Sequence, residues 1–134
     1  MKNKLSILAV IAFCLLSFGM TTNAQINAYN TTFYIQSQNV GPFTLQIAIE
    51  RYDGTYYDLS SLTGGPYYSG TTYSLPTNPW PFPDIPWPVS PPVTNYCRVW
   101  MYATRNGTTS PGHSGWLSPD NNGLVYPGLI IIPF

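Results

Sequence analysis

The chain has 134 residues, a formal net charge of zero and only 7% charged residues, whereas 16% of its residues are aromatic. The low charge argues against a nucleic-acid-binding protein, which needs a basic surface to neutralise phosphates. The aromatic content argues against an intrinsically disordered chain, which lacks the apolar side chains that form a core.

The first 24 residues have the layout of a secretory signal peptide. A basic start with Lys2 and Lys4 precedes an apolar run, and the small residue Ala24 ends the segment. The apolar run is shorter than a membrane-spanning helix requires. We therefore expect residues 1–24 to be cleaved and residues 25–134 to be secreted to an extracellular or periplasmic location, with no membrane span.

The remaining segment has about 110 residues, the size of a single domain. Both lysines lie in the signal peptide, so this segment keeps three arginines and five acidic side chains, a balance of −2. Such a charge provides no attraction for nucleic acid or for anionic lipid. Cys97 is the only cysteine left after cleavage, and we expect it to be a buried apolar residue.

The first expected strands show a clear two-residue period. Apolar and polar residues alternate at residues 31–36 and again at residues 43–50, as in strands with one buried face. Asp53 and Gly54 follow the second run. This pair predicts a hairpin turn, because both residues tolerate a positive φ. A short apolar piece at residues 71–75 is expected to form a further strand.

The later strands complete an all-β pattern. Residues 96–104 alternate and end at the turn sequence Asn106-Gly107, and the last strand is expected at residues 129–134. Four consecutive large aliphatic residues in this last strand predict that both of its faces are buried. We favour a strand clamped inside its own fold; the alternative is insertion into a neighbouring subunit. Six or seven short strands predict an all-β fold, specifically an antiparallel β-sandwich with immunoglobulin-like architecture.

A proline-rich segment at residues 76–92 interrupts this pattern. It contains eight prolines, which donate no hydrogen bond to a sheet, so we expect a loop and not a central strand. Trp80, Phe82 and Trp87 lie between the prolines. We favour a crossover whose aromatic residues cover one edge of the core; the alternative is a stiff loop that presents them to a partner.

A second aromatic surface is predicted on the strand at residues 96–104. Arg98, Trp100 and Tyr102 are two residues apart and therefore point to one side of the sheet. These residue types anchor protein interfaces, and aromatic rings also stack on sugars. For these three residues we favour cross-strand aromatic pairing that serves the sheet alone; a binding surface is the alternative.

No motif in the chain indicates catalysis, a metal or a cofactor. The single histidine, His113, lies in a Gly-His-Ser-Gly sequence that lacks the last glycine of a nucleophile elbow. Five carboxylates are present, but none forms a recognisable pair for glycoside hydrolysis. We expect no enzymatic activity and no cofactor; a hydrolase ranks third among the functions considered.

The sequence thus predicts a secreted, non-enzymatic binding or structural module that acts through aromatic and edge-strand surfaces. A protein partner or self-association is expected. The alternative is a carbohydrate-binding module, for which a glycan is the ligand. Asn30 and Asn106 lie in glycosylation sequons, which matter only in a eukaryotic source. The candidate binding residues are Trp80, Phe82, Trp87, Arg98, Trp100 and Tyr102.

Overall fold

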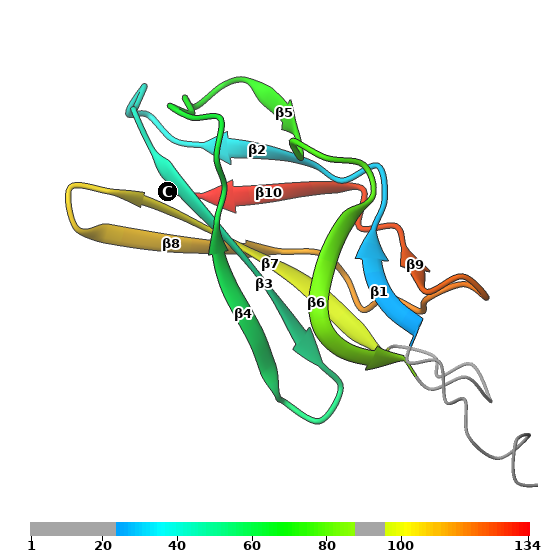
Figure 1. Ribbon diagram of the computed structural model, residues 1–134. Coiled ribbons are helices and arrows are strands. Elements are labelled where there is room, and N and C mark those ends of the chain that lie inside the picture. The colour runs from blue at the N-terminus through cyan, green and yellow to red at the C-terminus, as the bar shows by residue number, and fades with distance from the viewer. Residues whose placement is uncertain (1–23, 88–95) are drawn as a thin grey trace, which may run out of the picture.

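The computed structural model describes residues 24–87 and 96–134, and the regular elements in these ranges are all β-strands (Figure 1). The all-β prediction is therefore confirmed for this part of the chain. Among these residues there is no helix with the length and apolar composition needed to cross a membrane. The expected signal peptide lies almost entirely outside the described residues. The strands in chain order are β1 (Ala24–Ala28), β2 (Thr32–Gln36), β3 (Thr44–Arg51), β4 (Tyr56–Ser61), β5 (Thr72–Ser74), β6 (Trp80–Trp87), β7 (Cys97–Arg105), β8 (Thr108–His113), β9 (Leu124–Val125) and β10 (Leu129–Pro133).

The largest sheet has four antiparallel strands in the order β4-β3-β7-β8. β3 and β7 are paired along their whole overlap, from Thr44 opposite Thr104 to Arg51 opposite Cys97. The turn between β7 and β8 is the predicted one, because Asn106 and Gly107 both have a positive φ, at 51° and 78°. The strand predicted over residues 96–104 is confirmed as β7, with buried and half-buried residues in alternation.

The other six strands form two three-stranded sheets that continue into each other. Their orders are β6-β1-β9 and β5-β2-β10, and each strand of the first sheet is joined by a short linker to its counterpart in the second. The linkers bend at Asn30 (φ 51°) and Gly128 (φ 66°). Asn30 and Asn78 hold two of the linkers together. Asn30 N donates a hydrogen bond to Asn78 Oδ1 at 3.0 Å, and Asn78 Nδ2 donates one to Asn30 Oδ1 at 2.9 Å. These bends contribute to the larger number of strands, ten in the described residues where six or seven were predicted.

Two strand pairs correct the prediction of a purely antiparallel fold. β1 pairs with β9, and β2 pairs with β10, in parallel register. A parallel pair needs a long connection between its strands. Most of the domain lies between the members of each pair, so the chain readily supplies that connection.

The proline-rich segment is not a loop throughout, because β6 lies within it. β6 runs antiparallel to β1 and forms the edge of its sheet (Figure 1). Prolines are tolerated there because an edge strand needs hydrogen bonds on one side only. The register of the pair shifts between Gln25 and Asn27, as expected for irregular pairing. The expectation that the prolines exclude a central strand agrees with this edge position; residues 88–92 lie outside the described part.

One hydrophobic core is shared by the four-stranded sheet and the two smaller sheets. Cys97 is fully buried in it, as predicted. Its largest fully buried side chains are Tyr96, Phe33, Phe43, Ile26, Ile35, Leu45, Ile47, Ile49, Met101, Ile130, Ile132 and Val99.

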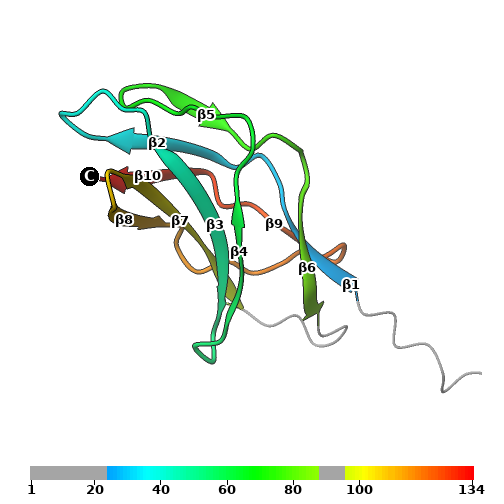
Figure 2. The ribbon, with the colours of Figure 1, turned by 60° about the vertical axis from the view of Figure 1, so that its left-hand side comes forward.

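β10 corrects the prediction that both faces of the last strand are buried. Ile130 and Ile132 are fully buried, whereas Leu129 and Ile131 are 54% and 50% exposed. β10 lies between β2, to which it is hydrogen-bonded, and β8, which runs beside it (Figure 2). Only one of its faces therefore meets the core, so the strand alternates like the others.

Candidate binding face on the four-stranded sheet

The structure places five of the six predicted binding residues, and these do not form one surface. Arg98, Trp100 and Tyr102 share the face of β7 that points away from the core, as predicted. Phe82 is only 4% exposed and belongs to the core, so its assignment as a binding residue is corrected. Trp80 is half-buried and packs against the core, which fits the favoured role of covering a core edge. The side chain of Trp87 lies outside the described part of the structure.

Arg98 and three aromatic rings form a continuous stack, here called the aromatic ladder (Trp116, Arg98, Trp100 and Tyr102). The guanidinium carbon of Arg98 lies 4.7 Å from the ring centre of Trp100 and 4.9 Å from that of Trp116. The rings of Trp100 and Tyr102 are nearly parallel, with centres 6.0 Å apart and an angle of 15°. Cation–π and stacking contacts therefore hold the ladder in one conformation.

Glu50 on β3 fixes the middle of the aromatic ladder. Its Oε2 accepts hydrogen bonds from Arg98 Nε and from Trp100 Nε1, the latter at 2.7 Å. The hydrogen bond from Arg98 is the main cause that lowers the pKa of the Glu50 carboxyl below its usual value of 4.5, against an opposing effect of burial. Glu50 is thus ionised at neutral pH, and it neutralises the charge of Arg98.

Further rings flank the aromatic ladder on neighbouring strands. The centre of the His113 ring on β8 lies 4.5 Å from the centre of the Trp100 ring, and the centre of the Tyr56 ring on β4 lies 6.3 Å from the same point. Ala48, opposite Trp100 in register, is fully buried even though it lies on this outer face. The aromatic side chains therefore cover the middle of the sheet, while Tyr56 and Trp116 remain 51% and 41% exposed at its margins.

Sequence reasoning did not identify three members of this face. Glu50 and Tyr56 come from strands far from β7 in the sequence, and only the pairing register brings them beside Arg98 and Trp100. Trp116 follows β8 in a segment without regular structure, so no periodicity could place it. The alternation of residues in β3 placed Glu50 on the polar face of that strand, but it did not predict that Arg98 and Trp100 would bond to its carboxylate.

A hollow of about 900 Å³, here called the outer hollow, adjoins the other end of the same sheet. Thr44 and Gln46 line it from the outer face of β3, and Thr104 does so from β7, two residues beyond Tyr102. Arg105 also lines it. The remaining lining residues are Pro42, Phe43, Leu45, Ser61, Leu62, Gly65, Pro66, Tyr67, Asn106 and Thr109.

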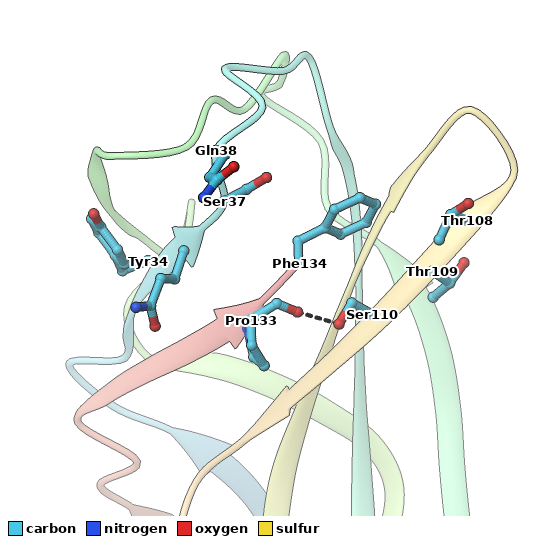
Figure 3. A pocket seen from close by; sticks show the side chains of 9 residues that line it. Tyr34, Ser37, Gln38, Thr108, Thr109, Ser110, Pro133 and Phe134 are labelled. Carbon is cyan, nitrogen blue, oxygen red and sulfur yellow. Dashed lines mark hydrogen bonds between the residues drawn. The ribbon is translucent and has the colours of Figure 1, made fainter.

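A second, more open groove of about 760 Å³ lies between β2 and the start of β8. Figure 3 shows Tyr34 on one side and Thr108 and Thr109 on the other, with Pro133 and Phe134 between them. Ser110 donates a hydrogen bond to the Pro133 carbonyl beside the groove. Its described lining residues include no Asp, Glu, Lys, Arg or His side chain.

Neither a metal-binding cluster nor a thiol–imidazole pair is found among the described residues. In residues 24–87 and 96–134 no group of three or more His, Cys, Asp or Glu side chains is placed to hold a metal ion. Burial raises the pKa of the Cys97 thiol to about 12, which keeps it protonated. Cys97 points into the core, whereas His113 packs on the outer face, so the two do not form a thiol–imidazole pair.

The outer face therefore offers a large aromatic area that is held by contacts within the chain and is exposed at its margins. Tryptophan, tyrosine and arginine are the residues that most often dominate binding energy at interfaces. Comparisons of the chain with protein-family models, with curated proteins and with solved structures give no match.

Proposed function

We propose that the protein is a secreted, non-enzymatic binding module that engages a second copy of itself through the outer face of the four-stranded sheet. The observation that carries this proposal is the aromatic ladder, which has an exposed member, Trp116, and an exposed neighbour, Tyr56. The ladder is ordered by contacts within the chain. Few side chains would thus lose rotamer freedom on binding, which reduces the entropic cost of association.

A second copy is favoured as the partner because the face carries little net charge. The Glu50 carboxylate neutralises Arg98, so no charge of one sign selects an oppositely charged protein. A neutral aromatic face can meet itself across a two-fold axis, the commonest arrangement of homodimers. β4, which carries Tyr56, is also the edge of its sheet in the described structure and contains no proline, so it can extend the contact by strand pairing.

Sedimentation velocity tests this proposal on residues 25–134 over a wide concentration range. We expect a reversible monomer–dimer equilibrium that is weakened by about tenfold or more when Trp116→Ser and Tyr56→Ser are combined. Leu129→Ser is the matched control, because Leu129 is equally exposed but lies on another sheet. A protein that stays monomeric at every concentration, or a dimer that only Leu129→Ser disrupts, would contradict the proposal.

A carbohydrate-binding module is the second candidate, and the outer hollow is the observation that favours it. Trp100 is a poor sugar platform, because Arg98 lies over its ring and Tyr102 stacks parallel to it. The outer hollow instead combines apolar walls with a polar rim, which is typical of small-ligand sites. A glycan array probed with the wild-type protein and with Gln46→Ala tests this candidate; binding that survives the substitution would place the glycan elsewhere.

The proposal includes secretion and an immunoglobulin-like sandwich. A single core between the four-stranded sheet and the smaller sheets supports a sandwich, in which the facing sheets lie about 10 Å apart and are aligned within about 30°. Sheets that cross at right angles in an experimental structure would contradict it.

The layout of residues 1–24 supports export. An exported protein whose intact mass still includes these residues would contradict cleavage after Ala24.

A further inference from the structure

The outer hollow has the size and the fixed walls of a small-ligand site. Its volume of about 900 Å³ lies within the usual range for such sites, roughly 300–1,000 Å³. Phe43 and Tyr67 are joined by backbone hydrogen bonds of 2.8 and 3.3 Å, and both side chains are buried. Leu62 N donates to the Leu45 carbonyl at 2.9 Å, which ties the segment after β4 to β3. The walls are therefore preformed.

The rim of the outer hollow is rich in polar groups that suit a ligand with many hydroxyls. The side chains of Gln46, Ser61 and Asn106 make no hydrogen bond to any residue that the structure describes, so their donors and acceptors are available. The hydroxyls of Thr104 and Thr109 are 2.8 Å apart and bond to each other. Amide and hydroxyl groups that both donate and accept match the hydroxyls of a sugar.

Arg105 supplies the positive charge of the outer hollow. Of the three arginines in residues 25–134, Arg98 is paired with Glu50, and Arg51 lies 3.7 Å from Asp53. Arg105 has no carboxylate within ion-pair distance among the described residues, and no acidic residue occurs among those that line the hollow. Its guanidinium carbon lies 5.9 Å from the centre of the Phe43 ring, which holds the half-buried cation at the wall.

We infer that the outer hollow binds an acidic saccharide whose carboxylate or sulfate group pairs with Arg105. The inference rests on the carbohydrate-binding candidate described above and names its ligand class. A guanidinium group presents paired N–H donors to a planar carboxylate or to the oxygens of a sulfate. The rim amides and hydroxyls then hydrogen-bond the sugar hydroxyls, and the exposed rings of Pro42 and Pro66 pack against the ring carbons.

Titration calorimetry on residues 25–134 tests the inference with three hexasaccharide probes. The probes are a galacturonate oligomer, a sulfated heparin-derived oligomer and neutral maltohexaose, and the two acidic arms distinguish carboxylate from sulfate. We expect at least one acidic probe to bind about tenfold or more tightly than the neutral one. Arg105→Gln should abolish this preference, Arg105→Lys should retain part of it, and added salt should weaken it.

Gln46→Ala and Gln36→Ala form a matched pair, because both glutamines lie on strands but only Gln46 lines the outer hollow. We expect weaker binding of the acidic probe in the first variant and unchanged binding in the second. Equal binding of acidic and neutral probes, or full affinity in Arg105→Gln, would overturn the inference and leave the carbohydrate-binding candidate standing. The absence of binding to all three probes would overturn the inference.

If Arg105→Gln lowers the melting temperature through loss of the contact with Phe43, the Arg105→Lys variant and the salt series still decide the matter. An affinity that does not change with salt and is unaffected by Arg105→Lys and Gln46→Ala would count against the inference. Sedimentation of the same variants reports separately on self-association. The two proposals therefore fail independently.

Discussion

At the scale of single residues, two buried hydroxyls differ in whether they have a partner. Ser114 is 4% exposed, and its Oγ accepts a hydrogen bond from Val99 N at 3.0 Å and donates to the Gly115 carbonyl at 2.7 Å. Thr31 is 3% exposed, but its Oγ1 has no hydrogen-bond partner within the described part of the chain. The first hydroxyl contributes to folding, whereas the second is buried at a cost.

This difference predicts opposite effects of two conservative substitutions. Ser114→Ala should lower the free energy of unfolding by about 1–3 kcal/mol, because it leaves Val99 N without its acceptor. Thr31→Val preserves shape and removes an unpaired hydroxyl, so it should leave that free energy unchanged or raise it. Urea unfolding measures both values. A Thr31→Val variant that is as destabilised as Ser114→Ala would show that Thr31 has a partner, such as a bound water.

Glu50 gives the aromatic ladder a dependence on pH. Its lowered pKa means that the native state favours the carboxylate more than the unfolded state does. The stabilisation is complete above the usual pKa of 4.5 and is lost as the pH falls through the lowered value. Glu50→Gln should therefore be less stable than the wild type at pH 7, and the difference should shrink in acid. Unfolding curves between pH 7 and pH 2 test this; a difference that stays constant would contradict it.

At the scale of elements, β8 and β10 belong to different sheets and pack closely against each other. A methyl group at Gly112 would overlap the carbonyl oxygen of Ile131. Gly112 has an ordinary φ, so the restriction comes from the neighbouring backbone and not from the turn geometry. Glycine is thus required for the two strands to pack together.

Gly112→Ala should consequently push β8 away from β10 and destabilise the protein. We expect a loss of about 1–3 kcal/mol, as for other overpacked sites. Gly115→Ala is the matched control, because a methyl group there would meet no atom within 4 Å and its φ is also not positive. Thermal unfolding of the two variants gives the comparison. Equal melting temperatures would mean that β10 does not depend on this contact.

The same elements show how far the sequence predicts this fold. The alternation in β7 predicted the shared face of Arg98, Trp100 and Tyr102, because that signal is local. The pairing of Glu50 with Arg98 was not predictable, since it depends on a register between strands 48 residues apart. β8 was not predicted, because Pro111 and Gly112 resemble turn residues. Both are nevertheless compatible with an edge strand, which is the position of β8 in its sheet.

At the scale of the whole molecule, both ends of the domain are tied together. β1 pairs with β9, and β2 pairs with β10, so the first two and the last two strands of the described chain complete two sheets together. The exposed residues Leu129 and Ile131 lie on β10, on a different sheet from the aromatic ladder. In the described part of the chain, these exposed apolar side chains lie apart from the aromatic face, and the proposed function places self-association on the aromatic face alone.

Hydroxyl-radical footprinting of residues 25–134, in dilute and in concentrated solution, distinguishes these two areas most directly. The proposed function predicts that oxidation of Trp116 and Tyr56 falls as the concentration rises, because the outer face of the four-stranded sheet becomes buried. Oxidation of Tyr126 and Leu129, which are 53% and 54% exposed, should stay constant. Protection of Leu129 or Tyr126 with no change at Trp116 and Tyr56 would contradict the claim that the aromatic face is the binding surface.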